Sequence, residues 1–552
     1  MKTTNNIYIV RNKNNKNGKT YLFAVKSNGF KKGFTKLASL GALEELQKIN
    51  PHALELLKKE CAKMSIETPK EVIKNELLNS INILKEKIEY KNYGVNLIYK
   101  LIKKLEIFNS IPKTKHKDLE AILEYQISSR IIHPNSIISS FNSKYKYDNN
   151  INSKKDTFYS LLDVLNENQS KIFNDLNKRI ANLTGRDIEL VFYDSSTVYF
   201  ETFEREGLRY PGYSKDGKFK EDQVVVGMAT DANGIPIHIK LFKGNTTDVN
   251  TFIPFVVELK KSYNIKNITI IADKGMSSNR NIRFLEDLGI NFIISYRAKA
   301  GSEAFKKYIL DPEGYEGDEK FRYKESYFDS MWKSKRFNGK RRRRIITWSE
   351  SRSFKDAEDR KILIDNFKKR QDKEGIVTED KILGIKKFKF FKKIGNLKFK
   401  LDYEKIQEDE QFDGIYVYET SRTDLNPEEI VAIYHKQWQI EENFRTLKNA
   451  LKIRPIYVNS TNHIFGHFVL CFLALVVIKY ALFIINKKLE EDYGLLDKIT
   501  NKNFIDAIES ATVTISYYGD NEMERKYHTN DSNLINYENY KIFEKIISKI
   551  SM

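Results

Sequence analysis

The strongest constraint on the fold lies in the middle of the chain, where apolar β-forming runs alternate with helical patterns. Residues 188–201 form one such run, and residues 223–245 read as two strands joined by a turn at Asp231–Gly234. Helix, strand, helix and strand patterns then follow over residues 248–263, 267–276, 278–289 and 291–298. This order of three strands followed by alternating helices and strands predicts a mixed α/β sheet.

Two aspartates stand at the end or edge of these apolar runs. Asp194 follows IELVFY, and Asp273 follows ITIIA. A carboxylate in such a place must be paired, hydrogen-bonded or bound to a cation. Ligands of open α/β sheets gather at the carboxyl ends of strands, which makes these two residues candidates for a site. For either aspartate alone, a cap on a turn or helix is the simpler explanation.

A third acid lies in a helix that we expect to begin near Asn426. Pro427 suits the first helical position, and Glu429 stands three residues after the cap, as in a capping box. Tyr434, Glu441 and Lys448 are spaced by seven residues, which is close to two helical turns, so we expect them on nearly the same face. The alternative is an ordinary amphipathic helix, with Trp438 and Phe444 in the core.

Asp194, Asp273 and Glu441 together would make a site of oxygen ligands only. Such a site suits Mg²⁺ or Mn²⁺ rather than zinc. Two ions about 3.5–4 Å apart can clamp the attacking and leaving oxygens of a phosphoryl transfer. We therefore expect the three carboxylates to converge and to bind Mg²⁺ (or Mn²⁺), with two ions.

The charge of the chain favours a polyanionic partner. The 552 residues carry a formal net charge of +20, and eight of the twelve residues 333–344 are Lys or Arg. Two cysteines exclude a disulfide framework and a zinc finger, and the first residues lack the apolar core of a signal peptide. Residues 464–485 are apolar and long enough to span a membrane, but His467 and Lys479 favour a buried core helix.

Composition and pattern divide the chain into five expected regions. Residues 1–45 read as a small β unit and residues 46–185 as a helical DNA-binding region, for which a plain packing domain is the alternative. A catalytic domain is expected over 186–300 and 410–490, interrupted by a basic, β-rich insertion at 301–409. The remaining residues, 491–552, are polar and suggest a C-terminal helical tail.

Beyond these patterns, the chain resembles the DDE transposases of the insertion sequence four superfamily. The hallmark of that group is Tyr, two residues, Arg, three residues, Glu, six residues and Lys, and it falls on Tyr434, Gln437, Glu441 and Lys448. Gln437 stands where arginine is usual. Further similar blocks are FYDSSTVYFE, GYSKDGKFKEDQVVVGM, GIPIHIKLFKGNTTD, ITIIADKGM and the GH of IFGHFVL.

The resemblance implies a ribonuclease-H-like catalytic domain that cuts at transposon ends and joins the 3′-OH to target DNA. It assigns Asp194, Asp273 and Glu441 as metal ligands and catalytic residues, and it implies a homodimer on paired double-stranded DNA ends in the cytoplasm, without a membrane. The expected DNA contacts are Tyr434, Gln437, Lys448, Arg445, Lys274, Arg341, Arg342, Arg343 and Arg344. Trp348, or less favourably Trp332, is a candidate for stacking on an extruded base.

Two alternatives remain open from the sequence. The same three acids would serve a standalone ribonuclease-H-like DNA nuclease without strand transfer. A catalytically inactive DNA-binding or membrane-anchored protein, in which the acids are structural, would instead place the three carboxylates far apart or leave residues 464–485 exposed. The length of the basic N-terminal region and the insertion favour the transposase, since the recognition of DNA ends needs additional DNA-binding surface.

Overall fold

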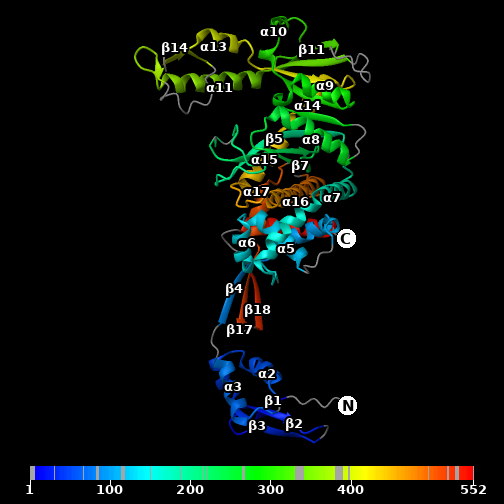
Figure 1. The fold of residues 1–552 in the computed structure, drawn as a ribbon. Coiled ribbons are helices and arrows are strands. Elements are labelled where there is room, and N and C mark those ends of the chain that lie inside the picture. Colours follow the sequence, from blue (N-terminus) through cyan, green and yellow to red (C-terminus); the bar gives the residue numbers. More distant parts are fainter. Residues whose placement is uncertain are drawn as a thin grey trace. The chain divides into compact units, whose positions relative to one another are not determined.

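The computed structural model describes two compact units (Figure 1). The described residues are 7–550 apart from 30–31, 66, 83–85, 113–117, 150, 187, 215–216, 219, 264–267, 330–340, 379–389, 396–397, 495–496, 519–520 and 529–533. Unit 1 consists of Met1–Tyr93, Lys146–Asp148 and Ser510–Leu534, and unit 2 contains the remainder of the chain. Each unit is therefore assembled from segments that lie far apart in the sequence.

Unit 1 contains two three-stranded antiparallel sheets. The first has the order β1 (Ile7–Lys13), β2 (Thr20–Ser27), β3 (Phe34–Ala42), and its core is shared with α1 (Leu43–Ile49), α2 (Ala53–Lys63) and α3 (Lys70–Asn82). The second sheet has the order β18 (Asn521–His528), β17 (Thr512–Tyr518), β4 (Glu86–Asn92). Strands thus occur in both segments that were expected to be helical, 46–185 and 491–552.

Unit 2 is built on a mixed sheet in which nine described strands follow the order β10-β11-β12-β16-β9-β8-β5-β6-β7. Its strands are β5 (Leu190–Tyr199), β6 (Gln223–Thr230), β7 (Pro236–Lys243), β8 (Thr269–Ala272), β9 (Asn291–Tyr296), β10 (Glu316–Gly317), β11 (Phe321–Asp329), β12 (Arg341–Ser349) and β16 (Ile415–Thr420). With α8 (Asp248–Tyr263) and α9 (Asn279–Asp287), the order of β5 to β9 agrees with the sequence pattern. The predicted mixed α/β sheet is confirmed.

Side chains alternate in direction along each strand, and this alternation shows which residues lie on which face of the sheet. Val191 and Tyr193 of β5 pack in a buried core with Phe252 and Phe255 of α8 and with Leu285 of α9. Because successive side chains of a strand point to opposite faces, Asp194 leaves the sheet on the face away from α8 and α9. That face is in contact with α15 (Trp438–Arg445) at β5 and β6, and with α14 (Pro427–His435) at β9.

The long apolar helix α16 (Thr461–Tyr493) lies in the core of unit 2. It is long and apolar enough to cross a membrane, but 94% of its most apolar window is buried inside the protein. It packs closely on α7 (Lys155–Thr184) at Gly466. The two backbones approach so closely there that a Cβ atom at this position would lie only 2.1 Å from the carbonyl oxygen of Leu162. The expectation of a buried core helix is confirmed.

The remaining helices of unit 2 complete the packing around α16 and the sheet. α4 and α5 contact α16, and α6 packs on α7. The bounds of these and the other helices are α4 (Val95–Lys104), α5 (Leu119–Ile132), α6 (Ile137–Ser143), α10 (Glu303–Leu310), α11 (Glu350–Lys368), α13 (Tyr403–Glu410), α17 (Asn501–Ser510) and α18 (Leu534–Ile550).

The segment expected to be an insertion, 301–409, has two parts. β10, β11 and β12 extend the central sheet, where β12 pairs with β16 in antiparallel register. The second part is a separate three-stranded sheet of β13 (Val377–Thr378), β15 (Lys398–Leu401) and β14 (Phe391–Gly395), whose apolar core includes Phe367 of α11. The basic, β-rich character of the sequence therefore corresponds to two different sheets.

Candidate active site

The two strand aspartates lie beside each other in the sheet. β5 and β8 are parallel, and their registered pairs run from Leu190 with Thr269 to Tyr193 with Ala272. Asp194 and Asp273 are the next residue of each segment, so their backbones are neighbours across the ladder. Adjacent strands lie about 4.8 Å apart, which brings two carboxylates to one place at the end of β8. The sequence predicted this neighbourhood from apolar runs alone.

Hydroxyl groups hold Asp273 from two sides. The Ser295 hydroxyl donates to Oδ1 of Asp273 at 3.1 Å, and the Tyr434 hydroxyl lies 3.5 Å from the same oxygen. Tyr434 also bonds Tyr416 through their hydroxyl groups at 3.2 Å. Burial raises the pKa of Tyr434, so its hydroxyl stays protonated and can donate to the carboxylate. Tyr434 is 8% exposed, which makes it a partner of the acid inside the protein.

Sequence reasoning did not find Ser295 and Tyr416, although a signal for Ser295 existed. Ile294 of β9 pairs with Ala272 of β8, and so Ser295 is the neighbour of Asp273 in the same ladder. Ser295 is a polar residue within an apolar strand, and the register places it beside Asp273. It could therefore have been identified once the pairing of β8 with β9 was known.

The helix that carries Glu441 is irregular on both sides of that residue. α14 ends at His435, and the amides of Gln437, Gln439 and Ile440 bond carbonyls three residues earlier, which tightens the turn. After α15, the segment Thr446–Ala450 is a wider π turn. A tight turn followed by a wide one breaks the regular period of 3.6 residues. The helix is therefore not regular between Tyr434 and Lys448, and the expectation that Tyr434, Glu441 and Lys448 share one face stays a prediction.

Gln437 faces the interior and holds α15 on the sheet. Its side-chain Nε2 donates to the carbonyl oxygen of Tyr193 at 3.1 Å, and the residue is 6% exposed. Tyr193 directly precedes Asp194, so this bond places the start of α15 beside the first aspartate. Trp438, the next residue, is 56% exposed, contrary to the core position considered for it, whereas Phe444 is buried.

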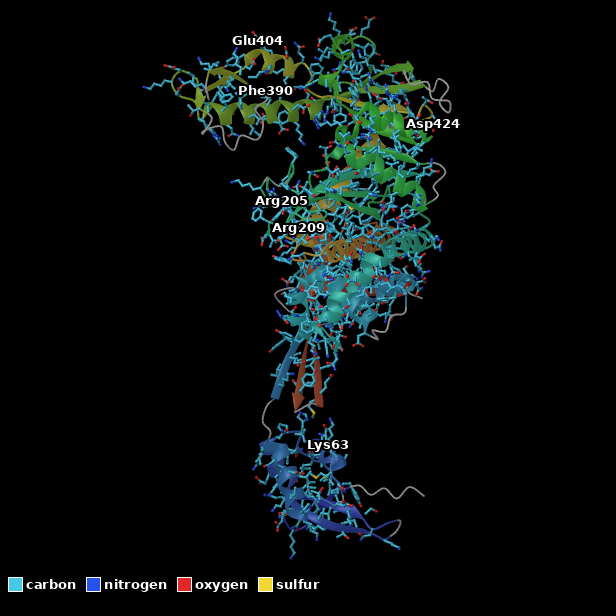
Figure 2. The ribbon with its side chains drawn as sticks, viewed as in Figure 1. Lys63, Arg205, Arg209, Phe390, Glu404 and Asp424 are labelled. Carbon is cyan, nitrogen blue, oxygen red and sulfur yellow. The ribbon has the colours of Figure 1, made fainter. Side chains whose placement is uncertain are left out.

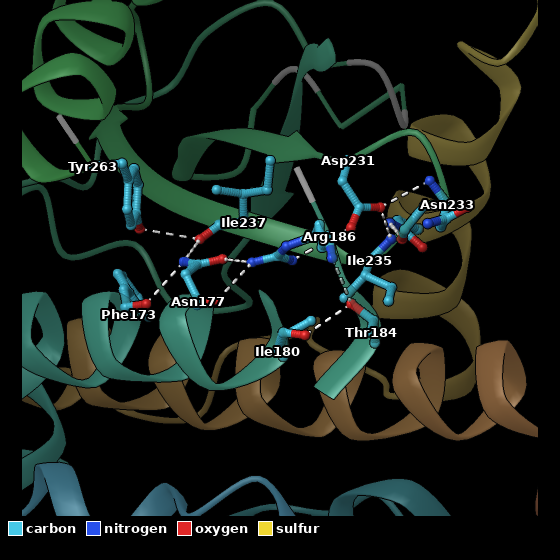
Figure 3. Close-up of polar contacts among 12 residues, drawn as sticks. Phe173, Asn177, Ile180, Thr184, Arg186, Asp231, Asn233, Ile235, Ile237 and Tyr263 are labelled. Atoms are coloured by element: carbon cyan, nitrogen blue, oxygen red, sulfur yellow. Dashed lines mark hydrogen bonds and ion pairs between the residues drawn. The ribbon is translucent and has the colours of Figure 1, made fainter. Parts of the chain in front are cut away.

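A turn between β6 and β7 supports α15 from the other side. The Asn443 side chain donates to the carbonyl oxygen of Gly234 at 2.8 Å. Figure 3 shows how the turn itself is fixed, because Asp231 accepts the backbone N–H groups of Asn233 and Ile235 and pairs with Arg186. Both charged side chains are almost fully buried, so the turn is a rigid support for α15.

Glu441 lies in α15, four residues after Gln437. It is exposed, and it lines a cavity of about 740 Å³ whose lining includes Trp438 and Lys479 but neither Asp194 nor Asp273. Among the residues that the structure describes, no group of three or more His, Cys, Asp or Glu side chains could hold a metal ion. The three carboxylates do not form such a group in this arrangement, and their convergence on a metal ion stays a prediction.

Of the four consecutive arginines 341–344 that were expected to contact DNA, three have carboxylate partners inside unit 2. Arg342 bonds Glu286 and Glu419. Arg343 bonds Glu325, and Arg344 bonds Glu419. Arg342 and Arg343 are 8% and 3% exposed. Their positions in β12 explain this, since the strand lies inside the sheet. The preceding residues of the basic cluster, 333–340, and Trp332 lie outside the described residues, and Arg341 is described only as part of β12.

A second cavity, of about 570 Å³, reaches Lys274, the residue that follows Asp273. It is lined by Lys274, Arg297, Arg352 and Tyr416, and also by Phe390 from the sheet that packs on α11 (Figure 2). Lys274 and Arg297 are exposed, whereas Arg352 pairs with Asp356 at 3.1 Å. Sequence reasoning proposed Lys274 but missed the two arginines, which come from distant segments.

The other residues that were predicted to contact DNA, and Trp348, lie elsewhere in the structure. Arg445 is exposed and lines the same cavity as Glu441, and Lys448 lies half-buried in the π turn. Trp348 lies half-buried, with the Arg322 guanidinium 4.6 Å from its ring centroid. The indole is thus already stacked on a cation of the neighbouring strand.

Comparison with known proteins identifies the family. No curated protein matches the chain in sequence. Among solved structures, it is similar to a piggyBac transposase synaptic complex with hairpin DNA, at 9% identity and TM-score 0.37 over 75% of this chain and 77% of that one. It is also similar to a Mos1 transposase paired-end complex with left transposon end, at 13% identity and TM-score 0.14 over 36% and 62%.

The sequence profile of the Transposase DDE domain family matches residues 185–477. The match covers more than half of the chain and spans both strand aspartates, Glu441 and most of α16. The chain therefore belongs to the Transposase DDE domain family.

Proposed function

We propose that this protein is the transposase of an insertion sequence of the insertion sequence four superfamily, and that it cuts DNA at the element's ends and joins the freed 3′-OH to target DNA. The observation that carries the proposal is the parallel register of β5 and β8, in which Asp194 and Asp273 each follow the last registered pair, Tyr193 with Ala272. In this proposal the mixed sheet is ribonuclease-H-like, and the segment 301–409 is its insertion.

The donor set fits a hard divalent cation. Both aspartates present carboxylate oxygens, and Asp273 already accepts hydroxyl donors from Ser295 and Tyr434. Mg²⁺ and Mn²⁺ prefer such oxygen ligands. Glu441 would complete the set after its side chain turns toward Asp194, a change that the exposed position of Glu441 permits.

The residues of this chain would act on the DNA in distinct ways. Bound divalent ions would activate the attacking hydroxyl and stabilise negative charge on the phosphate. Tyr434 holds Asp273 in place, and Gln437 holds the backbone before Asp194. Lys274, Arg297 and Arg352 would guide a DNA strand along the cavity that they line, with Arg445 and Lys448 as further phosphate contacts. In this proposal the protein acts as a homodimer on the paired ends, in the cytoplasm.

The test is cleavage of DNA that carries the element's own ends. The wild type with Mg²⁺ should nick the ends and transfer them to a target, and Asp273→Asn should lose at least about 100-fold in rate, as expected for loss of a metal ligand. Asp497→Asn, the same change at an exposed position, should keep the wild-type rate. Equal cleavage by wild type and Asp273→Asn would refute the catalytic assignment.

The second candidate, a ribonuclease-H-like nuclease, uses the same aspartates and differs only in strand transfer. A product assay separates the two. Joined DNA supports the transposase, whereas cleaved ends without joining, under conditions that stabilise paired ends, support the nuclease. Inverted repeats and a short target duplication around the gene would support the transposase independently.

A further inference from the structure

The small sheet that packs on α11 carries lysines that the proposed function does not use. Its order is β13-β15-β14, and Val377, Phe391 and Leu401 share an apolar core with Phe367 of α11 (Figure 1). Residues 381–400, which include β14 and most of β15, contain eight lysines and no Asp or Glu. This segment is therefore strongly cationic, whereas α11 itself contains charges of both signs.

The strand register places three of these lysines on the face opposite the core. Phe391 is paired with Leu401, and both side chains are buried. Because side chains alternate along a strand, the next pair, Lys392 with Lys400, lies on the other face of the sheet. Lys398 stands two residues before Lys400 and therefore lies on that face as well.

These three side chains reach solvent and lack acidic partners. Lys392 and Lys398 are exposed, and Lys400 is half-buried. In the part of the chain that the structure describes, none of the three forms an ion pair, whereas Lys405 of α13 pairs with Asp402 at 3.5 Å. Their ammonium groups can therefore contact an anion from outside the protein.

The arrangement also places like charges close together. Lys392 and Lys400 are directly opposite each other, and like charges in such a pair are destabilising. Adjacent strands lie about 4.8 Å apart, and Lys398 and Lys400 are about 7 Å apart along β15. These distances are within the Debye length of about 8 Å at physiological ionic strength, so salt screens the repulsion only in part. A bound polyanion would relieve it.

From this arrangement we propose that the lysine face of the small sheet, defined by Lys392, Lys398 and Lys400, binds the phosphate backbone of double-stranded DNA without reading its sequence. This inference rests on the proposed function, since that function supplies the DNA. It adds a separate contact, because none of the three lysines lines either of the two cavities described above.

The residue types of the face explain why the contact is with phosphates. An ammonium group is a compact point charge, without the planar donor fork of arginine. Contacts to phosphates position a protein on DNA, whereas contacts to base edges carry the sequence information. The other described residues near these lysines are Thr378, which is paired with Lys398, and Ile394, which lies in the bulge of β14. Such a face suits DNA of varying sequence, as target DNA is.

The test measures binding of the full chain to two labelled duplexes of about three helical turns, one from the element's end and one of unrelated sequence. Lys392→Gln combined with Lys398→Gln should weaken binding of both duplexes by the same factor, about 10-fold, and lower the salt dependence by about two phosphate contacts. Lys58→Gln combined with Lys59→Gln, at exposed positions of α2, removes the same charge and should leave affinity within about twofold.

Two further measurements separate charge from folding. The core of the small sheet contains none of the replaced side chains, and the loss of Lys392 removes its repulsion with Lys400. The glutamine variant should therefore unfold at the temperature of the wild type or above it. Lys392→Arg combined with Lys398→Arg keeps both charges and should bind both duplexes within about twofold of the wild type.

Several results would overturn the inference. Unchanged affinity of the folded glutamine variant would do so directly. Equal weakening by the α2 variant would show that net charge alone explains binding, and a loss confined to the end duplex would show that the face reads sequence. Weaker binding to phosphatidylserine vesicles at unchanged duplex affinity would make the partner a membrane surface.

The Asp273→Asn variant separates this inference from the proposed function. It should bind both duplexes as the wild type does, because the lysine face is intact. If it also cleaves as the wild type does, the proposed function fails while the DNA contact stands. If it loses cleavage while the folded glutamine variant binds normally, the proposed function stands and the inference fails.

Discussion

Buried polar side chains determine where the helix beside the two aspartates lies. Gln437 donates to the backbone of β5, Asn443 donates to the turn between β6 and β7, and the hydroxyl of Tyr434 approaches Asp273. A buried donor or acceptor without a partner costs about 1–3 kcal/mol. Each of these bonds therefore resists a shift of α14 or α15, and together they hold the region around the acids.

Substitution of Gln437 tests this role directly. Gln437→Ala removes the donor to the Tyr193 carbonyl, so we expect the free energy of unfolding to fall by about 1–2 kcal/mol and cleavage to slow, with DNA affinity unchanged. Denaturant unfolding and duplex binding measure the two effects. Gln407→Ala, at an exposed position of α13, is the control. Weaker DNA binding at unchanged stability would instead make Gln437 a DNA contact.

The buried His467 side chain should make the stability of the fold sensitive to acid. Burial lowers its pKa from 6.5 to about 3. The unfolded chain therefore takes up a proton at a pH at which the folded chain does not, and stability is full above about pH 6.5 and falls as pH decreases toward 3. The expected slope is about 1.4 kcal/mol per pH unit for one proton. Unfolding measured across this range should show a shallower slope for His467→Gln than for wild type.

An exposed histidine serves as the control for that measurement. His435 lies on the surface of α14, and His435→Gln should leave the slope unchanged. An identical slope in wild type and His467→Gln would contradict the assignment of this sensitivity to His467.

At the scale of elements, ion pairs join β12 to its neighbours. Arg342 bonds Glu286 at the end of α9 and Glu419 of β16, and all three side chains are buried. Removal of one partner from a buried pair leaves an uncompensated charge, which is more costly than the pair itself is stabilising. These ion pairs therefore hold β12 in the central sheet, although the sequence pattern assigned this strand to an insertion.

Arg342→Met should therefore destabilise unit 2. The expected loss is about 3–5 kcal/mol, because the buried Glu286 and Glu419 both lose the Arg342 guanidinium and only Glu419 keeps Arg344, and denaturant unfolding measures it. Arg280→Met, on the exposed side of α9, should change stability by less than about 0.5 kcal/mol. A stable Arg342→Met variant with weakened DNA binding would restore the DNA-contact role expected from the sequence.

At the scale of the whole molecule, the two units have separate sheets and separate cores. Unit 1 depends on a segment near the C-terminus, since β4 pairs with β17, and Val513 and Ile515 of β17 are 0% exposed. Units with their own cores are expected to open independently.

Ile515→Asp tests this independence. A buried carboxylate without a partner should disrupt the sheet of β4, β17 and β18. Hydrogen exchange should then speed up in Glu86–Asn92 while protection of β5 and β8 stays as in the wild type. Lys526→Asp, at an exposed position of β18, should leave both unchanged. Faster exchange throughout β5 and β8 in Ile515→Asp would show that the units unfold together.

The sequence by itself predicted the part of the central sheet from β5 to β9 and proposed two residues of the candidate site. Periodicity located the strands and helices from β5 to β9, since alternation and helical spacing depend on local patterns of apolar residues. The capping box at Asn426 and Glu429 was also predicted from a local pattern, and the structure contains it. Asp194 and Asp273 could be proposed because a carboxylate at the end of an apolar run is locally conspicuous.

Only the tertiary structure decided what each of these side chains contacts. Gln437 turned inward because Tyr193, 244 residues earlier, offers it a carbonyl oxygen. The Arg342 side chain lies inside the protein because Glu286 and Glu419 form ion pairs with its guanidinium group. The turns on either side of α15, with i→i−3 bonds before it and a π turn after it, also appear only in the structure. Such partners are distant in the chain, and their pairing depends on packing that no local pattern encodes.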